Sequence, residues 1–524
     1  MANRCANRLV HVYRIIRSVG LLVPATDNCP MLLNPFQPQF NARLAAGLLT
    51  ALGSLAAGAQ ALPPEIDALL ARAKVPREAF AAVVVDATPA LNGKTAPLLS
   101  HRASSPMNPA SVMKLVTTYA GLELLGPAFT WNTPVYVDGP ILNGVLQGNL
   151  IIQGKGDPKL VMERLWLLLR RIQGLGIKTI SGDIVLDRSA FAAPAQNPGD
   201  FDGEALRPYN VQPDALLVNY KSVVMTFVPH PGSGTASVSF DPPLASVQMQ
   251  ASVPLSAGSN GHAALAECGD YRAQLKPDFA DPFRMTFNGS YPVACGEKVW
   301  SIAYPDPASY AQRAIAGLWR EMGGVLGGRV REGLAAPALA PAFVMESASL
   351  AEVIRDINKF SNNVMAQQLF LTLSLQRTGG ASFDASREVV RNWWRGRFGE
   401  PGGGQDMPVL DNGSGLSRLE RVTPQGLARL LQTAYISGAM PELMASLPIT
   451  GVDGTLKRSK SQVSQGWAHL KSGSLRDATA LAGYVHTPSG RRLVVVGIVN
   501  HPNAAAARPA LEALVDWAVK EGSR

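Results

Sequence analysis

The stretch NPASVMKLVTTYAGLELLG, residues 108–126, decides how this chain is interpreted. It begins as a helix would, with Asn108 as the N-cap and Pro109 at the first helical position, where no backbone donor is lost. Gly126 followed by a proline predicts its end. The residues between are mostly apolar, which predicts a buried helix. Ser111 and Lys114 stand out, because residues three apart face the same way on a helix.

This pair of polar side chains has two interpretations. Lys114 could extend to the surface while Ser111 acts as a second cap. Alternatively, partial desolvation would lower the pKa of Lys114, and its amine could then take a proton from the Ser111 hydroxyl. Because a Ser-x-x-Lys spacing also arises by chance in a chain of 524 residues, the rest of the sequence has to decide between them.

The composition predicts a large globular protein. With 47% hydrophobic and 17% charged residues over 524 positions, the chain can bury a full core and divides into about three domains. The net charge of +9 would suit an anionic partner, such as acidic lipid in a weak peripheral membrane association, or would simply favour solubility. The basic residues are scattered without interleaved aromatics, so we expect no nucleic-acid partner.

The N-terminal region, residues 1–61, is expected to hold an extension and a signal peptide. Arg43 precedes an apolar run from Leu44 to Ala59, and Ala59-Gln60-Ala61 matches a signal-peptidase site. The run is shorter than the roughly 20 residues of a membrane span. We therefore expect export to the periplasm and a mature chain that starts near Leu62, with an uncleaved anchor as the alternative. Met31 is a candidate start as well as Met1.

The four cysteines fall on either side of this cleavage point. Cys5 and Cys29 precede it, which leaves Cys268 and Cys295 in the mature chain. A lone pair in an exported protein predicts one disulfide, and two buried free thiols are the alternative. Neither cysteine has partners at metal-ligand spacing, so we expect no zinc site.

The two ends of the mature chain are expected to form one discontinuous domain. AAVVVDA (81–87) is typical of a buried strand, and ATALAGYVHT (478–487) with RRLVVVGIVN (491–500) indicates a hairpin. An amphipathic helix over 507–522 follows. We expect the catalytic domain over 62–132 and 338–524, strand-rich inserted domains over 133–337, and a second inserted subdomain at about 190–297.

Two further motifs follow Ser-x-x-Lys. Ser361-Asn362-Asn363 lies where one predicted helix ends and another begins, and Lys471-Ser472-Gly473 lies just before the hairpin. Alone, the first motif could be a helix cap and the second a lysine at a strand edge. Together and in this order, the three motifs are those found in β-lactamases and penicillin-binding proteins.

The long interval between Lys114 and Ser361 narrows the resemblance. The chain resembles the class C low-molecular-mass penicillin-binding proteins, the D-alanyl-D-alanine carboxypeptidase/endopeptidase family of DacB type. Asn362 replaces the commoner Asp, and Ser472 the commoner Thr. Further matches are GKGDP (154–158), SGDIVLDRSAF (181–191), LDNGSGLSR (410–418), GVDGTLKRS (451–459) and LAGYVHTPSGRRL (481–493).

The resemblance implies both a fold and an activity. The fold is α+β, the serine β-lactamase/DD-peptidase-like transpeptidase fold, an antiparallel sheet with helices on both faces, here with a large strand-rich insertion. The activity is that of a peptidoglycan DD-peptidase with a serine acyl-enzyme. It would remove terminal D-alanine from pentapeptide stems and cleave D-Ala–meso-diaminopimelate cross-links, bind β-lactam antibiotics covalently, and need no cofactor or metal.

The resemblance also implies residue roles. Ser111 would be the nucleophile, Lys114 its base and Ser361 a proton relay to the leaving amine. Asn363 would hold the peptide carbonyl and orient Lys114, and Lys471 would be a cation that attracts the terminal carboxylate. The backbone N–H groups of Ser111 and Ser474 would form the oxyanion hole. The residues expected to bind substrate are Lys471, Ser472, Gly473 and Ser474.

Two other function classes share these motifs. A β-lactamase would also need rapid deacylation, but no Glu-x-x-Leu-Asn-like motif is present and the insertion argues against it. A non-catalytic muropeptide-binding protein would not need all three motifs. Asp411, Ser414 and Arg418 either shape the substrate cleft or form a tight turn. His469 and the other histidines are expected to be structural.

Overall fold

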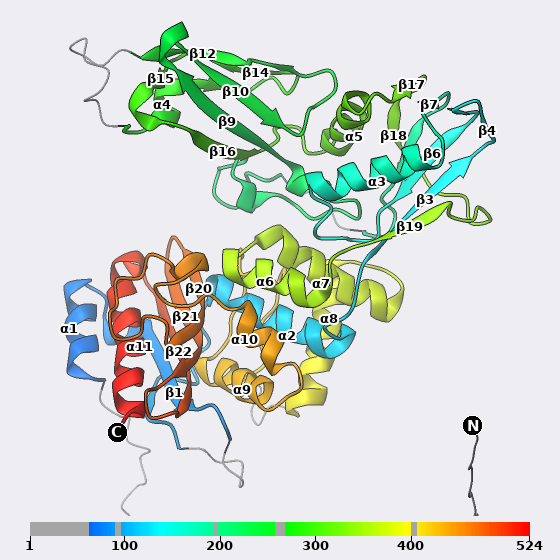
Figure 1. The fold of residues 1–524 in the computed structure, drawn as a ribbon. Coiled ribbons are helices and arrows are strands. Elements are labelled where there is room, and N and C mark those ends of the chain that lie inside the picture. Colours follow the sequence, from blue (N-terminus) through cyan, green and yellow to red (C-terminus); the bar gives the residue numbers. More distant parts are fainter. Residues whose placement is uncertain (1–61, 90–95, 193–196, 257–267, 400–405) are drawn as a thin grey trace, which may run out of the picture. The chain divides into compact units, whose positions relative to one another are not determined.

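The computed structural model describes residues 62–89, 96–192, 197–256, 268–399 and 406–524 (Figure 1). The expected extension and signal peptide, residues 1–61, lie outside these ranges. No helix within them is long and apolar enough to cross a membrane.

A five-stranded antiparallel sheet joins the two ends of this chain. Its order is β2 (Leu99–His101), β1 (Phe80–Asp86), β22 (Arg492–Asn500), β21 (Ala478–His486) and β20 (Ala468–Leu475). Val83 of β1 pairs with Val496 of β22, so the first and last strands lie side by side at the centre. β20 is an edge strand and carries Lys471. The hairpin predicted over 478–500 is confirmed.

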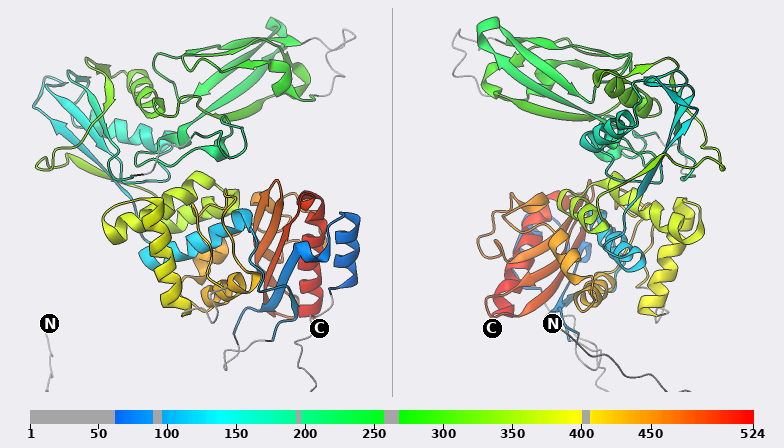
Figure 2. Two further views of the ribbon diagram at one scale, coloured as in Figure 1. Left: turned by 180° about the vertical axis from the view of Figure 1, so that it is seen from behind. Right: turned by 45° about the vertical axis from the view of Figure 1, so that its right-hand side comes forward.

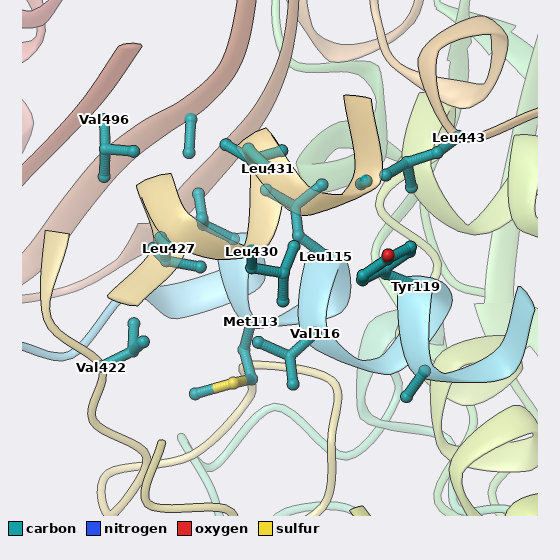
Figure 3. Close-up of a cluster of buried hydrophobic side chains, with 14 of the residues drawn as sticks. Met113, Leu115, Val116, Tyr119, Val422, Leu427, Leu430, Leu431, Leu443 and Val496 are labelled. Atoms are coloured by element: carbon teal, nitrogen blue, oxygen red, sulfur yellow. The ribbon is translucent and has the colours of Figure 1, made fainter. Parts of the chain in front are cut away.

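Helices cover both faces of this sheet, as the fold prediction requires. On one face, α1 (Pro64–Arg72) and α11 (Arg508–Gly522) pack together, and the left view of Figure 2 shows the blue and red helices side by side. On the other face, α2 (Lys114–Leu125) packs against α9 (Pro424–Tyr435), with Val496 of β22 in the same cluster (Figure 3). The α+β fold predicted from the sequence is confirmed.

Four more helices complete the layer around α2. They are α6 (Leu350–Phe360), α7 (Asn363–Thr378), α8 (Phe383–Phe398) and α10 (Met440–Ser446). Ser361 ends α6 with a left-handed backbone, and the side chain of Asn362 accepts a hydrogen bond from the N–H of Met365 to cap α7. The two helices therefore break at the second motif, as expected.

The stretch 108–126 differs from a regular helix at its start. Asn108 Oδ1 accepts a hydrogen bond from the Ala110 N–H, but residues Ala110–Met113 form a 3-10 turn, and the α-helix begins at Lys114. Tight 3-10 turns are common at helix N-termini. The turn places Ser111 before α2 rather than inside it.

A strand-rich region lies between α2 and α6. One sheet has the order β18-β8-β6-β3-β19 and a second has the order β17-β7-β5-β4, with α3 (Met162–Gly174) and α5 (Tyr310–Glu321) packed in the same core. β19 lies beyond residue 337, the expected end of the inserted domains. The strands are β3 (Asn132–Asp138), β4 (Ile141–Leu142), β5 (Val145–Leu146), β6 (Asn149–Gln153), β7 (Thr179–Ile180), β8 (Ile184–Asp187), β17 (Val325–Leu326), β18 (Val330–Glu332) and β19 (Phe343–Glu346).

A further part of this region is built around a five-stranded sheet of order β15-β12-β10-β9-β16 and a small sheet of order β11-β14-β13. Cys268 and Cys295 form a disulfide beside it, which confirms the predicted pair and excludes free thiols. The elements are β9 (Ser222–His230), β10 (Thr235–Asp241), β11 (Gln248–Met249), β12 (Ser252–Ser256), α4 (Tyr271–Leu275), β13 (Pro277–Asp278), β14 (Arg284–Phe287), β15 (Tyr291–Pro292) and β16 (Lys298–Ala303).

Candidate active site

The three motifs, far apart in the sequence, meet beside β20, the edge strand of the sheet that joins the two ends of the chain. Ser111 comes from the 3-10 turn before α2, Ser361 from the break between α6 and α7, and Lys471 from β20. Ser111, Ser361 and the residues that follow Lys471 on β20 border a cavity of about 240 Å³. The residues that line it are Ser111, Ser361, Thr455, Ser472, Gly473, Ser474, Thr479, Ala480, Leu481, Arg508 and Leu511.

Lys114 lies at the centre of this arrangement and is 0% exposed, so the interpretation of Lys114 as a surface residue is wrong. Its Nζ is 3.0 Å from Ser111 Oγ, 2.6 Å from Asn363 Oδ1 and 2.5 Å from the Ser414 carbonyl oxygen. A neutral amine has two N–H bonds, which suit the two carbonyl oxygens, and one lone pair. The lone pair is then available for the hydroxyl proton of Ser111.

The electrostatic surroundings favour this neutral form. Burial lowers the pKa of Lys114 well below its usual value, and the nearby Lys471 lowers it further. Glu420 acts in the opposite direction on the pKa of Lys114. An amine with a lowered pKa can act as a general base near neutral pH.

Lys471 forms the second half of the site. It is also 0% exposed, and burial lowers its pKa to about 7. Its Nζ donates hydrogen bonds to Ser361 Oγ at 2.9 Å and to the Ser472 carbonyl oxygen at 2.7 Å. Ser361 therefore lies against one lysine at the edge of the cavity that Ser111 also borders.

Two glycines allow backbone segments to approach closely here. A Cβ on Gly473 would lie 2.4 Å from the Pro109 carbonyl oxygen, so only glycine lets β20 pass against the 3-10 turn. A Cβ on Gly415 would lie 2.0 Å from the Ala110 carbonyl oxygen. Both contacts bring neighbouring backbone up to the turn that carries Ser111.

The loop 411–418 has two parts with different contacts. Ser414 reaches Lys114 through its backbone carbonyl, while Asp411 Oδ2 accepts a hydrogen bond from Ser417 Oγ, as in a tight turn. Arg418 forms an ion pair with Asp477 at 2.9 Å and lies over the ring of Phe201 at 4.6 Å.

The structure adds residues that the sequence did not single out. The Tyr209 carbonyl, from the strand-rich region, accepts a hydrogen bond from Asn363 Nδ2 at 2.9 Å. Thr455 Oγ1 is 2.6 Å from Ser472 Oγ, and the buried Glu420 supports the loop before it. Thr455 lies within the quoted GVDGTLKRS match, whereas no sequence signal marked Tyr209 or Glu420.

The part of the chain that the structure describes holds no group of three or more His, Cys, Asp and Glu side chains arranged to bind a metal. His469, two residues before Lys471, is partly buried, and its ring centroid lies 5.2 Å from that of His486. The groups that the site brings together are the hydroxyls of Ser111 and Ser361 and the amines of Lys114 and Lys471.

Comparison with known proteins now adds the family. The sequence model of the D-Ala-D-Ala carboxypeptidase 3 (S13) family matches residues 62–521. The chain belongs to this family of peptidases. That result confirms the resemblance drawn from the three motifs.

Curated relatives and solved structures agree with it. The chain is 26% identical to D-alanyl-D-alanine carboxypeptidase DacB of Haemophilus influenzae over 77% of this chain and 82% of that protein. It is 28% identical to a D-alanyl-D-alanine carboxypeptidase of an Actinomadura species over 86% of this chain and 83% of that protein. The crystal structure of penicillin binding protein 4 (dacB) from H. influenzae matches with a TM-score of 0.66 at 25% identity, over 86% of this chain and 99% of that one.

Proposed function

We propose that this chain is a serine-type DD-peptidase that removes terminal D-alanine from the pentapeptide stems of peptidoglycan. The observation that carries the proposal is the buried Lys114 amine, 3.0 Å from Ser111 Oγ and hydrogen-bonded to two carbonyl oxygens. A serine hydroxyl needs such a base to attack an amide at neutral pH. The family and the names of the two relatives support the substrate class.

Acylation would proceed in two stages. Ser111 Oγ attacks the carbonyl carbon of the penultimate D-alanine while Lys114 Nζ takes the hydroxyl proton. The carbonyl oxygen becomes negative, and the N–H groups of Ser111 and Ser474 stabilise it. The C–N bond then breaks, and the proton held by Lys114 passes by way of Ser361, whose oxygen lies 2.9 Å from Lys471 Nζ, to the departing D-alanine nitrogen, so that Lys114 is neutral again.

Deacylation repeats these steps with water as the attacking group. Lys114 takes a proton from the water, the ester bond to Ser111 breaks, and the serine recovers its proton. Lys471, with Ser472 and Ser474 on the same strand, binds the substrate carboxylate next to the scissile amide, and the charge of that carboxylate favours the ammonium form of the lysine. A β-lactam would acylate Ser111 by the same first step and stay bound if water cannot reach the ester.

We extend the proposal to D-Ala–meso-diaminopimelate cross-links. In both substrates the leaving amine carries a carboxylate on the adjacent carbon, so the same lysine serves both. The catalytic domain is assigned to 62–132 and 338–524, with the inserted domains between them. The Tyr209 carbonyl on Asn363 supports a contribution of the inserted region to the site.

The proposed location is the periplasm, after removal of a signal peptide that ends near Ala61. The family match begins at residue 62, where the mature chain is expected to start, and this supports the cleavage point. Mass spectrometry of the N-terminus of exported protein tests the assignment. A mature chain that begins upstream of the apolar run would contradict it.

The test of activity uses purified protein, a fluorescent penicillin and defined muropeptides. We expect one covalent label, mapped to Ser111 by peptide mass spectrometry, together with release of D-alanine from a pentapeptide and cleavage of a cross-linked dimer. Ser111→Ala should abolish all three, while Ser104→Ala, a change at an exposed serine nearby, should alter none.

Each other function class gives a different result. Rapid turnover of penicillin without D-alanine release would indicate a β-lactamase. Binding of muropeptides with no label and no cleavage would indicate a non-catalytic binding protein. A label that persists in Ser111→Ala would contradict the assignment of the nucleophile.

A further inference from the structure

Glu420 is a buried carboxylate that the proposed mechanism does not use. It is 0% exposed and lies just after the loop 411–418. Its Oε1 accepts hydrogen bonds from three successive backbone N–H groups, those of Asp411 at 3.2 Å, Asn412 at 3.2 Å and Gly413 at 2.8 Å. One side chain therefore fixes the backbone of this segment.

The segment held in this way leads directly to the acceptor for the lysine. Ser414, the next residue, presents its carbonyl oxygen to Lys114 Nζ at 2.5 Å. On the same segment, the Gly413 carbonyl oxygen accepts a hydrogen bond from Thr117 Oγ1 on α2 at 2.6 Å. Glu420 and α2 thus hold opposite sides of the backbone that supports Lys114.

The second oxygen of Glu420 suggests a further role. Oε2 is buried and has no hydrogen-bond partner among the residues that the structure describes. Leaving a buried carboxylate oxygen unpaired costs free energy, and a neutral side chain could accept the same three N–H bonds. A purely structural role for Glu420 therefore does not account for its charge.

The charged groups around Glu420 point to Lys114 as the partner of that charge. Asp411, from the same loop, turns its Oδ2 to Ser417 and has its Oδ1 3.8 Å from Arg387. Arg421 binds the backbone oxygen of Glu420 rather than its carboxylate. Burial raises the pKa of Glu420 to about 7. The N–H bonds from Gly413 and Asp411 oppose this rise, the Asp411 carboxylate adds to it, and the positive charge of Lys114 opposes it.

We propose that Glu420 is a positioning residue for Lys114, which fixes the Ser414 carbonyl through the 411–413 backbone and stabilises the ammonium form of the lysine by its charge. This inference rests on the proposed role of Lys114 as the base. The carboxylate then sets the pH at which Lys114 becomes able to accept the Ser111 proton.

Glu420→Gln tests the charge, because its amide oxygen can still accept the three N–H bonds. Without the negative charge the ammonium form of Lys114 loses stabilisation, so its pKa falls. We expect the acid limb of the rate of penicillin acylation to move to lower pH by about one unit. The rate at the pH optimum should stay within a few-fold of the wild type.

Glu123→Gln is the matched control. Glu123 is a partly buried carboxylate on α2 that binds Tyr119, Trp393 and Arg397. It lies nine residues beyond Lys114, about 14 Å along a helix that rises 1.5 Å per residue. Its neutralisation should leave the acid limb unmoved.

A second pair of variants covers the case in which Glu420→Gln does not fold. Glu420→Asp and Glu420→Asn lose the same methylene and differ only in charge, so the acid limb of the Asn variant should lie below that of the Asp variant. The inference would be overturned if the acid limb lay at the same pH in Glu420→Gln as in the wild type, and at the same pH in Glu420→Asn as in Glu420→Asp. Wild-type protein that penicillin does not label would instead overturn the proposed function, so the two failures are distinguishable.

Discussion

Two regions of the molecule bury lysines in opposite ways. In the strand-rich region, Lys221 forms an ion pair with Asp214 at 2.9 Å. In the site, Lys114 and Lys471 donate to hydroxyl and carbonyl oxygens, and neither forms an ion pair among the described residues. A buried cation paired with a carboxylate stays charged, whereas an amine among neutral acceptors tends to lose its proton. The group that each lysine contacts therefore distinguishes Lys221, which has a structural role, from Lys114, which is the proposed base.

Lys114→Arg should have the largest effect, a loss of acylation that Lys221→Arg does not share. A guanidinium cannot lose its proton at any pH that the fold survives, so it cannot act as the base. We expect the rate of acylation by penicillin to fall at least about 100-fold. Lys221→Arg, which keeps the ion pair with Asp214, should acylate at nearly the wild-type rate. Near-wild-type acylation by Lys114→Arg would remove the distinction between the two regions.

Lys221→Met should instead affect stability. Among the described residues, it leaves the buried carboxylate of Asp214 with one ion-pair partner, the more distant Arg188 at 3.6 Å. We expect the free energy of unfolding to fall by about 3 kcal/mol, measured by urea denaturation. The folded fraction should still acylate within a few-fold of the wild type. A loss of acylation without a loss of stability would show that Lys221 serves the site.

The dependence of stability on pH sharpens the comparison further. The pKa of Lys471 is about 7 in the folded protein and 10.5 for a free side chain. Between these values the unfolded chain holds a proton that the folded chain lacks, so stability rises with pH, by up to about 1.4 kcal/mol per unit. Lys471→Met should flatten this slope between pH 8 and 9.5 in urea denaturation. An unchanged slope would mean that Lys471 is charged in the folded state.

Ser472→Thr should have the smallest effect. The hydroxyl that lies 2.6 Å from Thr455 Oγ1 is kept, and only a methyl group is added beside a partly exposed strand residue. We expect the kcat/KM for D-alanine release to change by about two- to three-fold. Ser472→Ala, which removes the hydroxyl, is the paired variant and should lower kcat/KM more. Equal effects of the two changes would exclude a role for this hydroxyl in binding.

Local patterns were enough to predict several elements. Alternating and continuous apolar runs predicted β1, β21 and β22, and the apolar stretch after Ser111 predicted a buried helix. The 3-10 form of the first turn was not predicted, because contacts with β20 and the loop at Gly415 shape it. No local pattern shows the pairing of β19 with β3, because it joins segments about two hundred positions apart.

The sequence by itself predicted the reacting groups of the proposed mechanism. The order of Ser111, Lys114, Ser361, Asn363 and Lys471 already indicated the family and the acyl-transfer chemistry, because that chemistry needs a hydroxyl and an amine one helical turn apart. Only the tertiary structure decided the protonation state of these groups and the residues that hold them in place. Burial lowers the pKa of Lys114, and the Ser414 carbonyl, Glu420 and Tyr209 come from loops that no local pattern marks. Desolvation depends on what the rest of the chain packs around a group, and that is settled only when distant segments meet.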